Sequence, residues 1–157
     1  MVQAVEHASE MVSEWVEVTQ AMIDDFGRAT LDSDPFHNDP EWAKDNTPYG
    51  GTIAFGFLTV SLLTHLAAKA IEGAGGNFKP EGGYFLNYGF DRMRLVAPVP
   101  TGSRVRGRFV KGPEQTDEAG RVRRSMDAVI EIEGGERPAL VATWLSVWVP
   151  DSVETRA

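Results

Sequence analysis

The hydrophobic and polar positions along the chain predict a helical first half and a stranded second half. Residues 15–18 (WVEV) alternate between apolar and polar side chains, as in a short strand. Thr19 then provides an N-cap, and apolar residues recur at helical spacing to about Thr30. We therefore expect a short strand that leads into a helix in this part of the chain.

Prolines interrupt the segment that follows. Pro35 excludes a regular helix over residues 32–38, because an interior proline removes a hydrogen bond and forces the preceding residue to be extended. Pro40 suits the first turn of a short helix over residues 41–46. A proline and two glycines at residues 48–51 then predict a turn.

A long apolar segment comes after this turn. From about Thr52 to Gly73 a helix of roughly 17 residues would be apolar on nearly every side, which is typical of a buried helix. The remainder predicts four or five strands, at residues 83–99, 103–112, 121–134 and 138–149. This order favours an α+β fold in which an antiparallel sheet wraps around one long helix.

Length and composition narrow the classes of protein. We expect a single domain over residues 1–157, with an N-terminal arm at 1–13 and a C-terminal tail at 150–157. The absence of Cys excludes disulfides and cysteine nucleophiles, and three scattered His residues do not form a metal-site pattern. The net charge of −8 argues against nucleic acid as a partner. With no signal-peptide pattern and no apolar run long enough to span a membrane, we expect a cytoplasmic protein without a membrane partner.

Asp32 and His37 are the first candidates for chemistry. Histidine titrates near neutral pH and suits general acid–base catalysis, and a carboxylate nearby can orient the ring or share a water with it. The same spacing also occurs in solvated surface loops, in which Asp32 caps a turn. Spacing alone leaves both interpretations open.

Glycines stand next to the predicted start of the long helix. Gly50 and Gly51 allow a sharp turn, and Gly56 has no Cβ to keep a ligand away from the backbone. The free N–H groups of a first helical turn can polarise an acyl oxygen. A turn followed by a close contact between helix and sheet explains these glycines equally well.

Other polar residues have ordinary structural explanations. On the predicted helix, Ser61 and Thr64 are expected to hydrogen-bond to the carbonyl four residues earlier, and His65 is expected to be a hydrogen-bonded core or interface residue. Arginines that alternate along the strands could bind phosphates, although a solvated sheet face is favoured: Arg92, Arg94, Arg104, Arg106 and Arg108.

Several linked motifs resemble the MaoC-like dehydratase family, in its short single-domain branch that includes the NodN-like proteins. The resemblance covers nearly the whole chain. It is carried by EWVEVTQAMIDDFGRAT (14–30), DSDPFHNDPEWA (32–43), YGGTIAFGFLTVSLL (49–63) and LNYGFDRMRLVAPVPTGSRVR (86–106).

This resemblance implies a hot-dog fold, in which a long central helix is wrapped by an antiparallel sheet, and a homodimer. It implies (R)-specific hydration of a trans-2-enoyl thioester of coenzyme A or of a carrier protein, or the reverse dehydration, without a cofactor. Asp32 and His37 would hold one water over the double bond, and either could accept the water proton. The amide of Gly56 would bind the thioester oxygen.

The resemblance also implies residues that contact the substrate: Gly51, Phe55, Thr64 and Asn87. Two positions depart from the family pattern. Phe55 stands where the family usually has His before the glycine, and Asp34 stands where Asn or Gln is usual.

Two other functions compete with this hypothesis. A hot-dog thioesterase typically has an acidic residue on the central helix, and this helix has none between Phe55 and Ile71. A non-catalytic acyl- or lipid-binding module would keep the fold without the chemistry, and the intact pair of Asp32 and His37 disfavours it.

Overall fold

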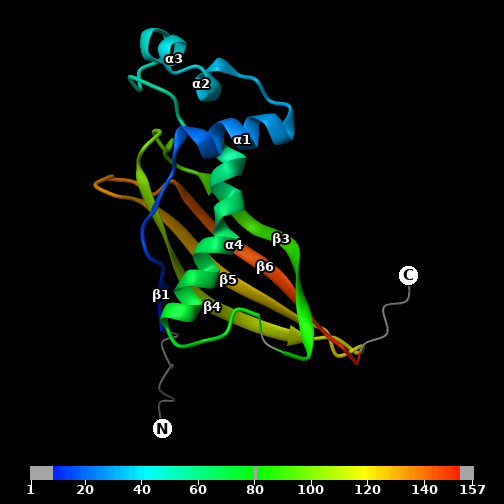
Figure 1. Ribbon diagram of the computed structural model, residues 1–157. Coiled ribbons are helices and arrows are strands. Elements are labelled where there is room, and N and C mark those ends of the chain that lie inside the picture. The colour runs from blue at the N-terminus through cyan, green and yellow to red at the C-terminus, as the bar shows by residue number, and fades with distance from the viewer. Residues whose placement is uncertain (1–8, 80, 153–157) are drawn as a thin grey trace.

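The computed structural model describes residues 9–79 and 81–152, and Figure 1 shows one antiparallel sheet with a long helix across its concave face. The parts of the expected arm and tail at residues 1–8 and 153–157 lie outside the described residues. The strands are β1 (Met11–Val12), β2 (Val16–Glu17), β3 (Gly83–Leu95), β4 (Arg104–Thr116), β5 (Val122–Ile132) and β6 (Leu140–Pro150). Their order is β1–β4–β5–β6–β3, with β2 also paired to β4, so β3 forms one edge of the sheet.

The helices are α1 (Gln20–Thr30), α2 (Pro35–Asn38), α3 (Pro40–Asn46) and α4 (Gly56–Gly73). The three short helices gather at the end of the molecule where α4 begins (Figure 1). None of the helices in the described part of the chain is long and apolar enough to cross a membrane. The predicted α+β arrangement, a hot-dog fold, is confirmed.

The core lies between α4 and the sheet. Leu63, Leu66 and Ala67 of α4 pack in one buried cluster with side chains of the sheet, among them Phe109 and Ile130. Burial of such side chains stabilises the fold by about 1.5–3 kcal/mol each. This packing places the start of α4 beside α1 and α2.

A glycine allows the close approach of helix and sheet. A Cβ on Gly107 of β4 would lie 2.6 Å from Cζ of Phe109 and 3.0 Å from Cβ of Leu66. Real Cβ atoms do not approach other atoms so closely, and overpacking of this kind typically costs about 1–3 kcal/mol.

The predicted first helix is confirmed. It begins after Thr19, whose hydroxyl accepts a hydrogen bond from the N–H of Met22 at 3.3 Å, and it ends at Thr30. The short helix after Pro40 and the turn before α4 are also present.

Two predicted boundaries are wrong. Residues 35–38 form one helical turn, because Pro35 occupies its first position, where a proline is favourable, and Asp34 caps it. The long helix begins at Gly56 rather than near Thr52, because the preceding residues pair with the chain around Val99: the N–H of Ala54 donates to Val99 O at 2.8 Å.

The arginines of β4 are paired with carboxylates. Arg104 contacts Glu133, Arg106 contacts Glu131 at 2.7 Å, and Arg108 contacts both Glu131 and Glu10. The hydrogen bond from Arg108 lowers the pKa of the exposed Glu10 carboxyl. These three arginines therefore form a paired outer face, as the favoured interpretation predicted.

Candidate active site

His37 lies on α2 with its ring fixed from two sides. Its Nδ1 is 2.7 Å from the carbonyl oxygen of Ile53, and its ring lies on that of Phe55, with 3.9 Å between centroids. A carbonyl oxygen only accepts hydrogen bonds, so Nδ1 carries the proton and Nε2 of the neutral ring has a lone pair. Nε2 has no hydrogen bond within the described residues, and it can therefore accept a proton.

Asp32 lies in the exposed turn between α1 and α2. Its N–H donates to Gly27 O at 3.0 Å and its carbonyl accepts from Nδ2 of Asn38 at 3.2 Å, so both helices hold its backbone. One carboxylate oxygen accepts the N–H of Asp34 at 3.1 Å. The other oxygen has no hydrogen bond within residues 9–79 and 81–152.

The start of α4 lies beside the His37 ring. Phe55, the N-cap of α4, is 4% exposed and packs between His37 and Phe26. No side chain caps this helix, so the amide of Gly56 in its first turn remains a hydrogen-bond donor. The fold thus brings a proton acceptor and an uncapped helix N-terminus together, an arrangement suited to proton transfer next to an acyl oxygen.

Gln20 connects the parts of this site. Its side-chain amide donates to the carbonyl of His37 and to Asp24, both at 2.8 Å. Its oxygen accepts from the hydroxyls of Thr52 and Thr101. Residue types alone did not select Gln20 as a functional residue, although it lies within the first motif of the family resemblance.

The departures from the family pattern both have structural partners. Phe55 fills a buried position against aromatic rings, as described above. The carboxylate of Asp34 accepts the N–H of Phe36 at 3.0 Å and so caps α2. Each residue therefore helps to place His37.

The other predicted residues lie elsewhere. Thr64 and Asn87 line a separate cavity between α4 and the sheet, which Asp32, His37 and Gly56 do not line. Gly51 lies in the turn before Thr52 and is partly buried. On the outer side of α4, Ser61 donates to Phe57 O as predicted. His65 is exposed, so it is not a core residue, and its alternative role at an interface stays a prediction. Within the described residues no cluster of three His, Asp or Glu side chains could hold a metal ion.

Comparisons with known proteins agree with this architecture. The family model described as "MaoC like domain" matches residues 3–131. Nodulation protein N of Rhizobium leguminosarum bv. viciae is 45% identical over 135 residues, which cover 86% of this chain and 81% of that protein. The 3-hydroxyacyl-thioester dehydratase Z of Mycobacterium tuberculosis (strain ATCC 25618 / H37Rv) is 38% identical over 131 residues, covering 83% and 82%. The MaoC-like dehydratase from Rhodospirillum rubrum has the same fold, with a TM-score of 0.71 at 18% identity over 95% of this chain and 96% of that one.

Proposed function

Because the chain belongs to the family of MaoC-like domains, we propose that it is a hydratase/dehydratase for acyl thioesters. It adds water to a trans-2-enoyl thioester of coenzyme A or of a carrier protein to give the (R)-3-hydroxyacyl thioester, or removes water in the reverse direction. The observation that carries the proposal is the contact of the His37 ring with the first residues of α4. The 38% identity to a 3-hydroxyacyl-thioester dehydratase supports the same reaction class.

In the hydration direction, the water oxygen forms a bond to the β-carbon of the enoyl group. Nε2 of His37 accepts one water proton, because Nδ1 is already committed to Ile53. Asp32 orients the water through its free carboxylate oxygen. The α-carbon then receives a proton from the pair, so that the elements of one water are added and the pair is restored.

Negative charge develops on the thioester oxygen as the β-carbon is attacked. The amide of Gly56 and the partial positive charge of the α4 N-terminus stabilise this charge, and loss of one such donor typically costs about 10²–10³-fold in kcat. A thioesterase is less well supported, since the described residues of α4 carry no carboxylate before Glu72.

The edge of the sheet at β3 supports a homodimer. β3 is an edge strand whose outer side has no partner strand among the described residues, and its Leu86 and Tyr88 are 50% and 62% exposed. An exposed apolar edge favours pairing with a second chain.

The test is hydration of trans-2-enoyl-coenzyme A of several chain lengths, followed by the loss of enoyl absorbance. Asp32→Asn and His37→Ala should each lower kcat by about 10²–10⁴-fold, because each removes a group that acts on the water. Asp25→Asn and His65→Ala, which change an exposed carboxylate and an exposed imidazole elsewhere, are the matched controls and should keep full activity.

Wild-type activity in both site variants would exclude the assigned pair. Failure of the wild-type protein to hydrate any chain length would instead favour the acyl-binding module without catalysis.

A further inference from the structure

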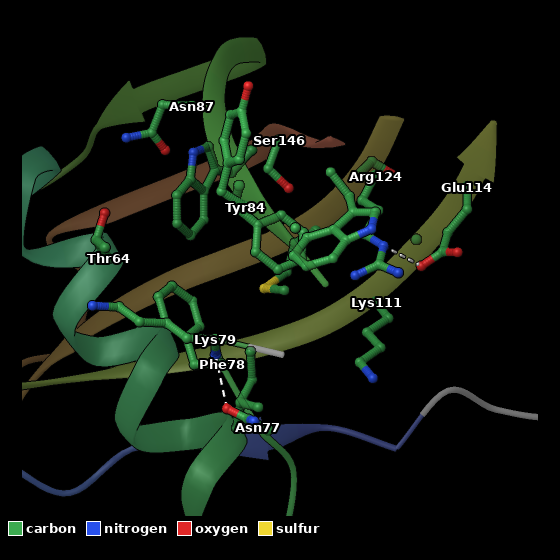
Figure 2. Close-up of a pocket in the computed structure, with 18 residues that line it drawn as sticks. Thr64, Asn77, Phe78, Lys79, Tyr84, Asn87, Lys111, Glu114, Arg124 and Ser146 are labelled. Atoms are coloured by element: carbon green, nitrogen blue, oxygen red, sulfur yellow. Dashed lines mark hydrogen bonds and ion pairs between the residues drawn. The ribbon is translucent and has the colours of Figure 1, made fainter. Parts of the chain in front are cut away.

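A cavity of about 470 Å³ lies between the C-terminal half of α4 and the concave face of the sheet (Figure 2). Its walls come from α4, the segment after it, and strands β3 to β6. Its volume is in the range of sites for small organic ligands. The catalytic residues proposed above do not line it, so its role is not yet assigned.

Five aromatic side chains line the cavity. They are Phe78, Tyr84, Phe85, Trp144 and Trp148, and Ile71 and Met126 add further apolar surface. The rings of Phe85 and Trp148 are 4.8 Å apart between centroids. Such a wall suits an extended apolar group.

The cavity is also locally basic. Lys79, Lys111 and Arg124 line it together with a single carboxylate, that of Glu114. This excess of positive charge occurs in a chain whose formal net charge is −8. The cavity therefore attracts a ligand with an anionic group, although the net negative charge of the whole chain would repel it.

Arg124 has donors that the protein does not satisfy. Its Nε is ion-paired with Glu114 Oε1 at 2.8 Å, whereas its two Nη atoms make no hydrogen bond to any described residue. Its guanidinium lies over the ring of Phe85, at 5.2 Å from the centroid. Because a guanidinium carries five N–H donors, the N–H groups on these Nη atoms are available to an oxygen acceptor supplied by a ligand.

The end of the cavity at Thr64 is the one nearer to the start of α4 and so to the proposed catalytic site. In Figure 2, Thr64 and Asn87 lie at one end, and Glu114 and Arg124 lie at the other. Thr64 follows Gly56 by eight residues on α4, about 12 Å along the helix axis. At about 1.2 Å per bond of an extended chain, roughly ten bonds cover this distance.

We propose that this cavity holds the acyl chain of the substrate and selects an acyl group whose far end bears an anionic oxygen group, bound by Arg124. This inference rests on the proposed function, since the ligand is the acyl group of the same thioester. A terminal carboxylate of the acyl chain and the phosphate of a pantetheine arm share this chemistry, and the experiment separates them.

Binding is measured without catalysis through the fluorescence of Trp144 and Trp148. The other two tryptophans, Trp15 and Trp42, do not line the cavity and are replaced by Phe in the full-length chain. The probes are the monomethyl ester of octanedioic acid and methyl octanoate, which differ in the terminal carboxylate. We expect the carboxylate probe to bind about ten-fold more tightly, the usual effect of one charge-assisted hydrogen bond.

Arg124→Gln should reduce this preference to within about two-fold. Arg123→Gln is the matched control, because Arg123 precedes it on β5, does not line the cavity and hydrogen-bonds to Gln115. It should keep the full preference. Glu114→Gln removes the ion pair but keeps Arg124, and the preference should persist or increase, which tests the proposal even if Arg124→Gln fails to fold.

Equal affinity of the two probes for the wild-type cavity overturns the proposal, as does an equal loss in the Arg123 and Arg124 variants. Quenching by 4′-phosphopantetheine that depends on Arg124, without quenching by the carboxylate probe, assigns the anion to the carrier and overturns the end-group assignment.

Turnover separates this inference from the proposed function. A trans-2-hexadecenoyl thioester with a terminal carboxylate, whose chain is long enough to extend past Thr64, should have about ten-fold higher kcat/KM than the methyl-ended one, with the difference lost in Arg124→Gln. Hydration of both thioesters with equal kcat/KM would leave the function intact and overturn the inference. Carboxylate-selective binding without any turnover would support the cavity assignment and overturn the hydratase function.

Discussion

At the scale of single residues, the proposed chemistry depends on two groups that the fold leaves available, Nε2 of His37 and the amide of Gly56. Nδ1 of the same imidazole is bound to Ile53, so the tautomer is set by a backbone carbonyl. Phe55 packs against the ring and is the N-cap of the helix whose first amide is proposed to bind the acyl oxygen. Three residues therefore fix both the proton acceptor and the donor to the oxyanion.

A backbone amide can be tested by proline, which has no N–H. Gly56→Pro is compatible with the start of α4, since proline is favoured at the first helical position and Phe55 already has an extended backbone (φ −56°, ψ 138°). We expect kcat to fall by about 10²–10³-fold. The measurement is steady-state hydration together with circular dichroism to verify the helix.

Gly56→Ala is the control for this change. Its Cβ meets the same side chain of Leu95 that proline would meet, but it keeps the N–H. Leu95 is half-exposed and can move, so this variant should keep most of its activity. Equal losses in the two variants would assign the effect to the contact with Leu95 and remove the amide from the mechanism.

At this scale the family resemblance was needed to propose Asp32, His37 and Gly56, because their residue types and spacing alone left a surface loop and a structural turn as equal explanations. Their supporting contacts could not be predicted. Gln20 acts through hydrogen bonds to residues up to 81 positions away, and no local pattern carries that information. The cavity that Thr64 and Asn87 line, apart from Asp32, His37 and Gly56, was likewise not predictable from residue types, and their contact with the substrate stays a prediction.

At the scale of elements, α2 is the part of the site with the least stability of its own. It is one turn of four residues, with Pro35 at its first position and the carboxylate of Asp34 as its cap. So short a helix has little stability of its own and depends on such contacts. The position of His37 is therefore sensitive to the residue at 34.

Asp34→Ala should displace α2, because the loss of an N-cap costs about 1 kcal/mol. We expect kcat to fall by roughly ten-fold with little change in KM. Asp34→Asn keeps a side-chain oxygen that can cap the turn, and it should remain within about two-fold of the wild type. If Asn reduced kcat as strongly as Ala, the negative charge of Asp34 rather than its cap would be the important property.

Element types were predictable from periodicity, and boundaries were less so. The cap at Thr19 is local and gave the correct start of α1. The residues just before Gly56 are as apolar as the residues of α4, so the hydrophobic pattern could not separate them from the helix. They hydrogen-bond instead to the chain near Val99, and a pattern along the sequence does not reveal such tertiary pairing. Pro35 was correctly identified as a break, but a proline can also begin a turn.

At the scale of the whole molecule, β3 leaves one edge of the sheet open, and we expect it to pair with a second chain. Leu86→Lys combined with Tyr88→Lys should give a monomer, because charged side chains on an edge strand oppose pairing. The measurement is molar mass by light scattering, and the wild type should have twice the mass of one chain. Val12→Lys on β1 at the other edge is the control and should remain dimeric.

A wild-type protein that is monomeric at all concentrations would contradict this expectation. So would a double variant that remains dimeric, because the contact would then lie on another surface.

The fold class was predictable at this scale, since one long helix followed by strands has few stable arrangements. The cavity of Figure 2 was not, because its lining comes from residues between Thr64 and Trp148 that meet only in the folded chain.

The contacts of Gln20 have a consequence for how this sequence can evolve. Its amide is at once a donor to the His37 carbonyl and an acceptor from Thr52 and Thr101. Glu would remove the donor to the His37 carbonyl, and Leu would also remove the acceptor of the 4%-exposed Thr52 hydroxyl and of the Thr101 hydroxyl. Substitutions at Gln20, Thr52 and Thr101 are therefore strongly epistatic, and lineages can change them together more readily than one at a time.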